Sequence, residues 1–276
     1  MFEGGRRVDE LKTNFVKNKP VISIVTVVRN CENTIEDTII NLINQEYPNI
    51  EYIVIDGGST DGTLKKIRKY EKSIDYWISE PDGGIYDAMN KGIDLATGDW
   101  VNFMNAGDYF FNNSTINLIV SEIRKQNFDI IYGDFIVAHQ NFNHKSLIKA
   151  KTTEKILYGN LYSHQSCFIK AKVIKQNKFN LKYKITADYF QMVSLFYQNN
   201  KFFYLPIPIS VMLAGGVSYS NINTYKEQIK IVHTFKPFSI SIFYFFCLIL
   251  LSYVRSMLGI KLVTLIRKIK WKFLAK

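Results

Sequence analysis

Apolar and polar positions alternate along the first hundred residues in a way that predicts strands and helices in turn. Apolar runs of strand length occupy residues 21–28, 51–56, 74–79 and 100–104. Apolar residues at helical spacing fill the stretches between these runs, and Pro48 ends the first of them. Strands that alternate with helices are typical of an α/β fold with a largely parallel sheet.

The second half of the chain has a less regular pattern. Residues 128–138 alternate like a pair of strands, and residues 162–174 resemble a strand that enters a helix. Residues 185–200 have the spacing of a helix, whereas 202–213 read as an extended segment with two prolines. No Pro/Gly-rich linker divides this half from the first, so we expect both halves to form one domain.

Composition predicts three segments. They are a polar, charged extension over residues 1–20, an α/β domain over 21–235, and a hydrophobic and basic segment over 236–276. The extension lacks the apolar stretch of a secretion signal. The three cysteines are far apart and form no CxxC pair, which favours reduced thiols and argues against a zinc site.

The net charge of +11 is concentrated at one end of the chain. Residues 255–276 contain seven Lys/Arg and no Asp/Glu, which leaves +4 for everything before them. A nucleic-acid-binding protein would more often spread its basic residues over a folded face, interleaved with aromatics. We therefore expect no nucleic-acid partner, although binding to nucleic acid remains an alternative for the basic tail.

The carboxyl ends of the predicted strands carry the candidate chemistry. In open α/β sheets ligands bind beyond these ends. The residues found there are Arg29 and Asn30, Asp56, the segment 80–84, and the segment 105–108. Three of these four ends carry acids, which is a pattern suited to binding a cation or hydroxyl groups.

Three stretches at these ends resemble a known family. They are SIVTVVRN, VIDGGSTDGT and SEPDGGIYDAMNKGIDLATGDWVNFMNAGD. Together they resemble the family 2 glycosyltransferases of the GT-A fold, a Rossmann-like mixed sheet flanked by helices, and in particular the bacterial members that build capsule, colanic-acid and O-antigen sugars. The resemblance covers about residues 20 to 215. The DGT sequence also occurs in haloacid-dehalogenase-type phosphatases, but the spacing from Asp56 to Asp61 does not fit their DxDGT motif.

The resemblance implies roles for individual residues in binding the donor. Thr26, Val28 and Asp56 would lie against the base and ribose of a nucleotide. Asp82 and Asn90 would border the nucleotide and the sugar. An Asp at a strand end is also a known ribose ligand in mononucleotide folds.

The sequence NAGD, residues 105–108, stands where the family has its metal-binding DxD motif. Its last acid is Asp108, a predicted ligand of Mg²⁺ or Mn²⁺, and Asn105 replaces the first acid while still offering an amide oxygen. A divalent ion on a diphosphate takes much of its coordination from phosphates and water, so this set can suffice. The alternative is that Asp108 only caps the following turn. His164 and Gln165 are predicted to lie near the acceptor or the donor sugar.

Asp188, at the start of the helix in TADYFQMVSLF, matches the acid that serves as catalytic base in inverting GT-A enzymes. An acceptor hydroxyl must lose a proton as it attacks the anomeric carbon, and a positioned carboxylate can take it. The alternative role for Asp188 is to stabilise the helix N-terminus.

The C-terminal segment predicts an association with membranes. Eighteen uncharged residues lie between Lys236 and Arg255, and as a helix they would span about 27 Å, slightly short of the hydrocarbon core. Residues 258–273 have the pattern of a basic amphipathic helix. A span would move the basic tail off the cytoplasmic side, so we expect an anchor lying on an anionic leaflet. A single span and a buried core helix are the alternatives.

We therefore expect a metal-dependent, inverting hexosyltransferase on the cytoplasmic face of the inner or plasma membrane. It would move a sugar from a nucleotide donor, a UDP-sugar rather than a GDP-sugar, to a glycan or polyprenyl-diphosphate-linked acceptor of cell-surface polysaccharide. The alternative from another class is a non-catalytic, membrane-attached scaffold of the same fold.

Overall fold

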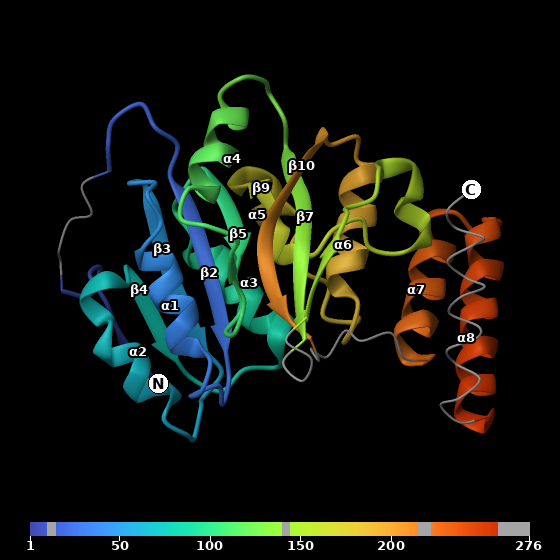
Figure 1. Ribbon diagram of the computed structural model, residues 1–276, viewed down its shortest axis with the longest axis horizontal. Coiled ribbons are helices and arrows are strands. Elements are labelled where there is room, and N and C mark those ends of the chain that lie inside the picture. Colours follow the sequence, from blue (N-terminus) through green and yellow to red (C-terminus); the bar gives the residue numbers. More distant parts are fainter. Residues whose placement is uncertain (10–14, 140–143, 215–221, 259–276) are drawn as a thin grey trace.

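A mixed sheet runs through the centre of the molecule in the computed structural model (Figure 1), which describes residues 1–9, 15–139, 144–214 and 222–258. The strands are joined in the order β1-β4-β3-β2-β5-β9-β7-β10-β6, and β8 pairs with β7. Their bounds are β1 (Phe2–Gly4), β2 (Ile22–Val28), β3 (Ile50–Asp56), β4 (Tyr76–Ser79), β5 (Trp100–Phe103), β6 (Tyr109–Phe110), β7 (Ile130–His139), β8 (His144–Ile148), β9 (Cys167–Lys170) and β10 (Phe202–Leu213).

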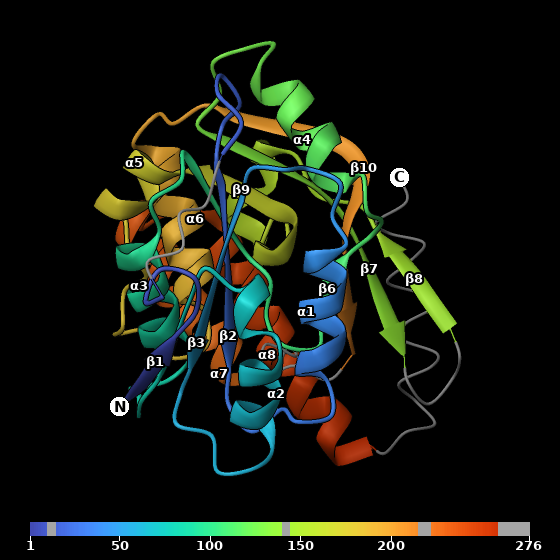
Figure 2. The same ribbon diagram turned by 90° about the vertical axis from the view of Figure 1, so that its left-hand side faces the viewer.

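Helices cover both faces of this sheet (Figure 2). The α-helices are α1 (Ile35–Ile43), α2 (Thr63–Lys69), α3 (Ile85–Leu95), α4 (Thr115–Ile123), α5 (Ala171–Gln176), α6 (Ala187–Tyr197), α7 (Ile222–Phe235) and α8 (Ile240–Leu258). Short 3₁₀ helices are η1 (Glu71–Ser73), η2 (Thr153–Tyr158) and η3 (His164–Ser166). Helices α1, α2 and α4 share one hydrophobic core, and α3, α5, α6, α7 and α8 share the other.

Strand β2 forms the middle of the parallel part of the sheet. All seven of its residues are buried, which suits the unbroken β-branched run of its sequence. It pairs in parallel with β3 and β5, and β3 pairs in parallel with β4. The register places Val28 opposite Asp56 and Asp56 opposite Ser79, so the carboxyl ends of these strands lie at one edge.

The α/β class and the alternation of elements in the first half are confirmed. The predicted strand pair over 128–138 is wrong, because this stretch is the single strand β7, whose hairpin partner β8 begins at His144. Gly133 lies within β7, where the backbone of β10 comes close, and it does not form a turn. A Cβ atom there would lie 2.7 Å from the Leu205 carbonyl oxygen of β10, next to the irregular pairing around Pro208.

Part of the predicted N-terminal extension belongs to the sheet. Strand β1 pairs antiparallel with β4. Arg6 forms an ion pair with Asp75 at 2.9 Å, and Arg7 forms one with Glu51; both acids are almost fully buried. Buried carboxylates need such partners, so these contacts hold the first residues of the chain to the sheet.

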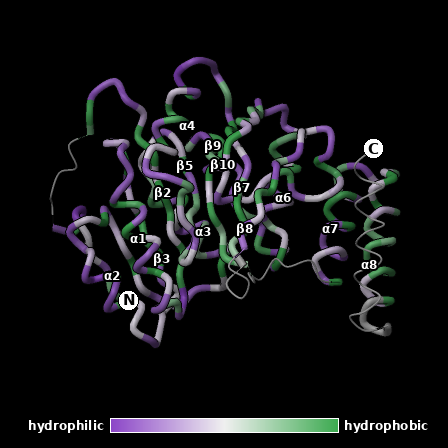
Figure 3. Tube along the Cα trace, in the orientation of Figure 1, coloured by the Kyte–Doolittle hydropathy of each residue, from purple (hydrophilic) through white to green (hydrophobic). Residues whose placement is uncertain are grey.

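The described C-terminal part forms two adjacent helices, α7 and α8, at one end of the molecule (Figure 1). Figure 3 shows that α8 is mainly hydrophobic along its length. Within the described residues, no helix combines the length and hydropathy needed to cross a membrane. The predicted amphipathic helix over 258–273 lies almost entirely outside the described residues.

Candidate active site

A pocket of about 780 Å³ opens beyond the carboxyl ends of the parallel strands, with walls from both halves of the chain. This volume is within the usual range for small-molecule sites. The ends of β2 and β5 and the start of α3 form one side, and η3, the segment before α6, and the ends of β7 and β10 form the other. Of the predicted site residues, the lining includes Val28, Asp82, Asn105, Asp108, His164 and Gln165.

The NAGD turn directs Asp108 into this pocket. Gly107 has a φ of 95°, in the left-handed region where glycine is favoured, and the Asp108 N–H donates to the Asn105 carbonyl at 3.0 Å. The Asp108 side chain accepts hydrogen bonds from Gln165 Nε2 at 2.6 Å and from the Leu213 N–H at 3.3 Å. Burial raises the pKa of Asp108 to about 6, although the bond from Gln165 opposes this shift.

Asn105 and Asp108 together fit a divalent ion that is bound mainly through a diphosphate. The Asn105 Oδ1 atom is buried and has no hydrogen-bond partner among the described residues, which leaves its lone pairs for a ligand. The described residues include no group of three or more His, Cys, Asp or Glu that could hold a metal by themselves. One carboxylate and one amide oxygen match the way Mg²⁺ is bound when phosphates supply the other oxygens.

Asp56 does not line the pocket. Its side chain is fully buried and accepts hydrogen bonds from the Ser79 hydroxyl at 2.6 Å and from the N–H and hydroxyl of Ser59. Asp82 does line the pocket and accepts a hydrogen bond from the Gly84 N–H at 2.9 Å. The structure thus places Asp82 in the wall of the pocket. The Asp56 carboxylate is instead bonded to the hydroxyls of Ser59 and Ser79.

Thr26 and Asn90 also lie away from the pocket lining. Thr26 is fully buried within β2. The Asn90 side chain forms two hydrogen bonds of 2.9 Å with the backbone of Phe179, one to its carbonyl and one from its N–H. Asn90 therefore holds α3 to the segment before α6. The sequence motif had suggested only a contact with the nucleotide and the sugar.

Asp188 is the second residue of α6. Its Oδ1 accepts hydrogen bonds from the Tyr86 hydroxyl at 3.0 Å and from the Tyr189 N–H at 2.9 Å, and its Oδ2 accepts one from Asn160 at 2.9 Å. The pKa of Tyr86 is raised, first by burial and then by the Asp188 carboxylate, so this hydroxyl stays a donor. Asp188 therefore lies just behind Tyr86, which lines the pocket.

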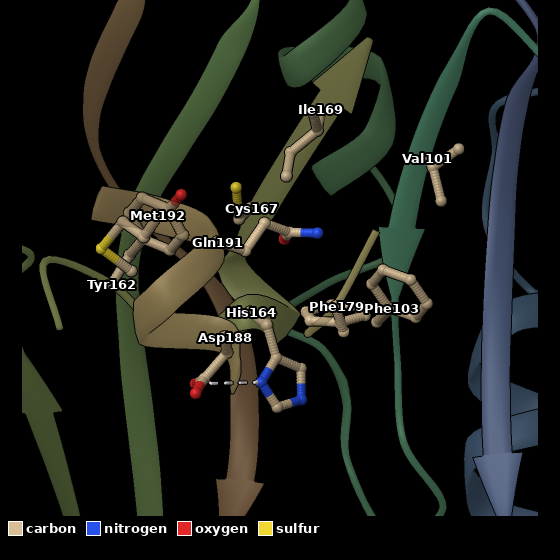
Figure 4. A pocket seen from close by; sticks show the side chains of 10 residues that line it. All are labelled: Val101, Phe103, Tyr162, His164, Cys167, Ile169, Phe179, Asp188, Gln191 and Met192. Carbon is tan, nitrogen blue, oxygen red and sulfur yellow. Dashed lines mark ion pairs between the residues drawn. The ribbon is translucent and has the colours of Figure 1, made fainter. Parts of the chain in front are cut away.

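His164 connects Asp188 to the NAGD turn. Its Nδ1 lies 3.8 Å from Asp188 Oδ2, a contact marked by the dashed line in Figure 4, and its Nε2 lies 2.9 Å from Asn105 Nδ2. With the Asn105 amide assigned as donor to Nε2, the neutral ring carries its hydrogen on Nδ1, facing Asp188. His164 and Asp188 also line a small cavity of about 20 Å³ behind the main pocket.

Two further residues of this pocket, Lys184 and Tyr86, were not identified from the sequence, and a third, Arg29, was noted only for its place at a strand end. Arg29 follows β2 directly, and Lys184 precedes Asp188 by four positions. Among the described residues, neither cation forms an ion pair. Two cations facing a pocket of this size are suited to the negative charge of a diphosphate.

The molecule has a mixed sheet with a pocket at the carboxyl ends of its parallel strands. One acid, Asp108, lies in a strand-end turn of this pocket, and a second, Asp188, lies at a helix start behind its wall. This is the arrangement expected of a GT-A-like fold. The model of the family described as Glycosyl transferase family 2 matches residues 23–197. The chain therefore belongs to glycosyl transferase family 2.

Individual relatives are also glycosyltransferases by name. A PGL/p-HBAD biosynthesis glycosyltransferase of Mycobacterium bovis is 29% identical over 175 residues, which cover 62% of this chain and 67% of the relative. An uncharacterized glycosyltransferase of Haemophilus influenzae is 28% identical over 226 residues, covering 77% of this chain and 86% of the relative.

Solved structures support the fold. S. aureus TarS in complex with UDP superposes with a TM-score of 0.62 at 20% identity, covering 78% of this chain and 64% of TarS. The mannosyltransferase PcManGT of Pyrobaculum calidifontis, in complex with GDP-Man and Mn²⁺, superposes with a TM-score of 0.61 at 14% identity, covering 81% of this chain and 66% of PcManGT. These similarities confirm the predicted GT-A-like fold, and this chain spans about two thirds of either structure.

Proposed function

We propose that this protein is an inverting hexosyltransferase that moves a sugar from a nucleoside-diphosphate donor to a glycan acceptor. The observation that carries this proposal is the placement of Asp188 directly behind Tyr86 and His164, two residues that line the same pocket as Asp82, Asn105 and Asp108. A carboxylate base then lies close to the groups that would bind the donor, as a displacement with general-base assistance requires.

In the proposed reaction, the acceptor oxygen forms a bond to the anomeric carbon while the bond from that carbon to the phosphate oxygen breaks. The nucleoside diphosphate leaves with the electron pair, and the acceptor proton passes to the Asp188 carboxylate. Tyr86 and Asn160 orient this carboxylate through their hydrogen bonds. Arg29 and Lys184 would attract the diphosphate.

Asn105 and Asp108 would hold a Mg²⁺ or Mn²⁺ ion against the diphosphate. When bound, the ion supplies positive charge that stabilises the leaving group. We favour a UDP-sugar over a GDP-sugar as donor. Both nucleotide classes occur among the structural neighbours, in TarS with UDP and in PcManGT with GDP-Man.

Inversion can be tested without knowing the acceptor, because water can take its place in a slow hydrolysis of the donor. Incubation with a UDP-α-hexose is expected to release the sugar first as the β anomer, since Asp188 activates the attacking oxygen on the face opposite the phosphate. Proton NMR follows the anomeric signals before mutarotation. Early appearance of the α anomer would contradict the proposal.

We propose that the protein binds the cytoplasmic face of the inner or plasma membrane through α8, and that its acceptor is a lipid-linked glycan of a surface polysaccharide. One face of α8 exposes Phe243, Phe246, Leu250 and Tyr253, each with about half to two thirds of its surface accessible. The opposite face packs Phe245 into the core. Residues 255–276, with seven basic and no acidic residues, add attraction to anionic lipid.

Replacing the exposed residues Phe243, Phe246 and Leu250 by serine should release the protein from anionic vesicles. Each apolar side chain contributes roughly 1.5 kcal/mol or more when it enters an apolar phase, so affinity should fall by about 1,000-fold or more. Co-sedimentation with phosphatidylglycerol vesicles measures the loss. Leu118→Ser, at an exposed position of α4, is the control that should leave binding unchanged. Full co-sedimentation of the triple variant would place the anchor elsewhere.

A further inference from the structure

Glu227 of α7 is bonded to the segment that leads into α6. Its Oε1 accepts a hydrogen bond from the Lys184 N–H at 3.0 Å. Its Oε2 accepts three more, from the Ile185 N–H at 3.1 Å, the Thr186 N–H at 3.0 Å and the Thr186 hydroxyl at 2.9 Å. One half-buried carboxylate thus receives three successive backbone N–H groups immediately before the helix that carries Asp188.

One of these bonds, from the N–H of the N-cap residue Thr186, is of the kind found in a helix cap. The first N–H groups of a helix have no partner within the helix, and a side chain at the N-cap usually accepts from them. Thr186, the N-cap of α6, makes no such side-chain bond. Glu227 orders the N-cap residue itself from another helix, and its negative charge lies at the positive end of the α6 dipole.

We propose that Glu227 is a positioning residue for the catalytic base, so that the C-terminal helices α7 and α8 complete the active site. This inference rests on the proposed function of Asp188. Glu227 itself does not line the pocket, and it acts by holding the backbone of the lining residues Lys184 and Ile185, which leads into the helix that carries Asp188.

A second contact explains why the position of this backbone matters for Asp188. The Tyr86 hydroxyl lies within hydrogen-bonding distance of both the Ile185 carbonyl, at 2.9 Å, and Asp188 Oδ1, at 3.0 Å. A shift of the segment 184–186 would therefore change the contact of the base with Tyr86 as well. Tyr86 from α3 and Glu227 from α7 hold the same segment from two different elements.

Packing between the helices keeps Glu227 in place. Phe235 of α7 stacks on Tyr197 of α6 with ring centroids 5.2 Å apart and lies 5.6 Å from Phe190. Tyr225 of α7 in turn lies 6.4 Å from Phe245 of α8. The family match ends at residue 197. Glu227 therefore lies outside the matched region, and the packing of α7 brings it to the start of α6.

The test replaces Glu227 by alanine and by glutamine in the full-length protein. Glu227→Ala removes every acceptor, whereas Glu227→Gln keeps one oxygen but turns an amide NH₂ toward a backbone N–H. Glu122→Gln, on α4, is the matched control for loss of one carboxylate charge. Turnover is measured as release of nucleoside diphosphate, donor affinity by calorimetry, and amide protection of residues 184–190 by hydrogen exchange.

We expect kcat to fall by about 10- to 100-fold in Glu227→Ala, less in Glu227→Gln and not at all in Glu122→Gln, because small displacements of a catalytic group are costly. Donor affinity should fall much less than kcat, because Lys184, whose backbone N–H Glu227 also holds, is only one of the groups that would bind the diphosphate. Amides 184–186 should exchange at least about tenfold faster in Glu227→Ala.

Three results would overturn the inference. The first is an unchanged kcat in folded Glu227→Ala protein, and the second is unchanged exchange of amides 184–186. Equal losses in donor affinity and turnover would also contradict a specific effect on the base. A wild-type protein that binds donors but never releases nucleoside diphosphate would instead refute the proposed function, and the exchange data would still report whether Glu227 holds the segment.

Discussion

Asp188→Asn should lose about 100- to 10,000-fold in kcat and keep its affinity for the donor. General-base catalysis contributes on this order, and an amide cannot accept the acceptor proton. Asp188 does not line the 780 Å³ pocket, so the donor-binding groups stay intact. Asparagine has nearly the same shape and can still accept the bonds from Tyr86 and Tyr189, although its NH₂ group will face Asn160.

The measurement pairs turnover with calorimetric donor binding on the same preparation. Asp94→Asn provides the matched control, because Asp94 is an exposed residue of α3 whose carboxylate pairs only with Lys178 among the described residues. Normal turnover by Asp188→Asn would remove Asp188 as the base and leave it the capping role that its place at the start of α6 also allows.

Asp108→Asn should abolish the gain in donor affinity that Mn²⁺ provides and lower kcat/KM on the order of 100-fold. Asp108 is the one carboxylate at the NAGD turn, and a neutral amide is a weak replacement for it as a ligand of a hard divalent ion. Calorimetric titration of the donor with and without Mn²⁺ measures the effect. A metal-dependent gain of unchanged size in the variant would show that the ion is held by other groups.

The pKa of Asp108 gives this prediction a pH dependence. Burial raises its pKa from 3.8 to about 6, so the carboxyl is mostly protonated below that pH and must lose its proton to bind a metal. The metal-dependent gain should therefore be full above pH 7 and weaken by up to about tenfold per pH unit below pH 6. The pKa of Asp108 is higher in the folded protein than in the unfolded chain. Without metal, the free energy of unfolding should therefore decrease as pH rises from about 4 to 6. Asp108→Asn should remove both effects.

The fold was predictable wherever apolar periodicity was local. The buried run of β2 and the helical spacing in α3 and α6 were assigned from the sequence, and the structure confirms them. Helix α7 was not predicted, because its apolar positions are interrupted by polar side chains such as Thr224 and Gln228 that are nevertheless buried. A strand pair was expected over β7 because alternation does not show where a hairpin turns.

The candidate site was predictable only in part, for a similar reason. The strand-end rule placed Asp82, Asn105 and Asp108 at the pocket because carboxyl ends of parallel strands converge. It also suggested Asp56, whose side chain is covered by serine hydroxyls. Sequence spacing gives no sign that Tyr86 meets Asp188, 102 positions away, or that Glu227 bonds to residues about forty positions before it. Such contacts arise from packing between distant elements.

Calorimetric titration of the wild-type protein with UDP-, GDP- and dTDP-sugars, with and without Mn²⁺, tests the central claim most directly. We predict saturable binding of one nucleotide class, strengthened by Mn²⁺, because Asn105 and Asp108 can hold an ion only together with phosphate oxygens. That result would identify the donor class and show that the NAGD turn works with one acid. Absence of binding to every donor by folded protein would contradict the claim and favour a non-catalytic scaffold of the same fold.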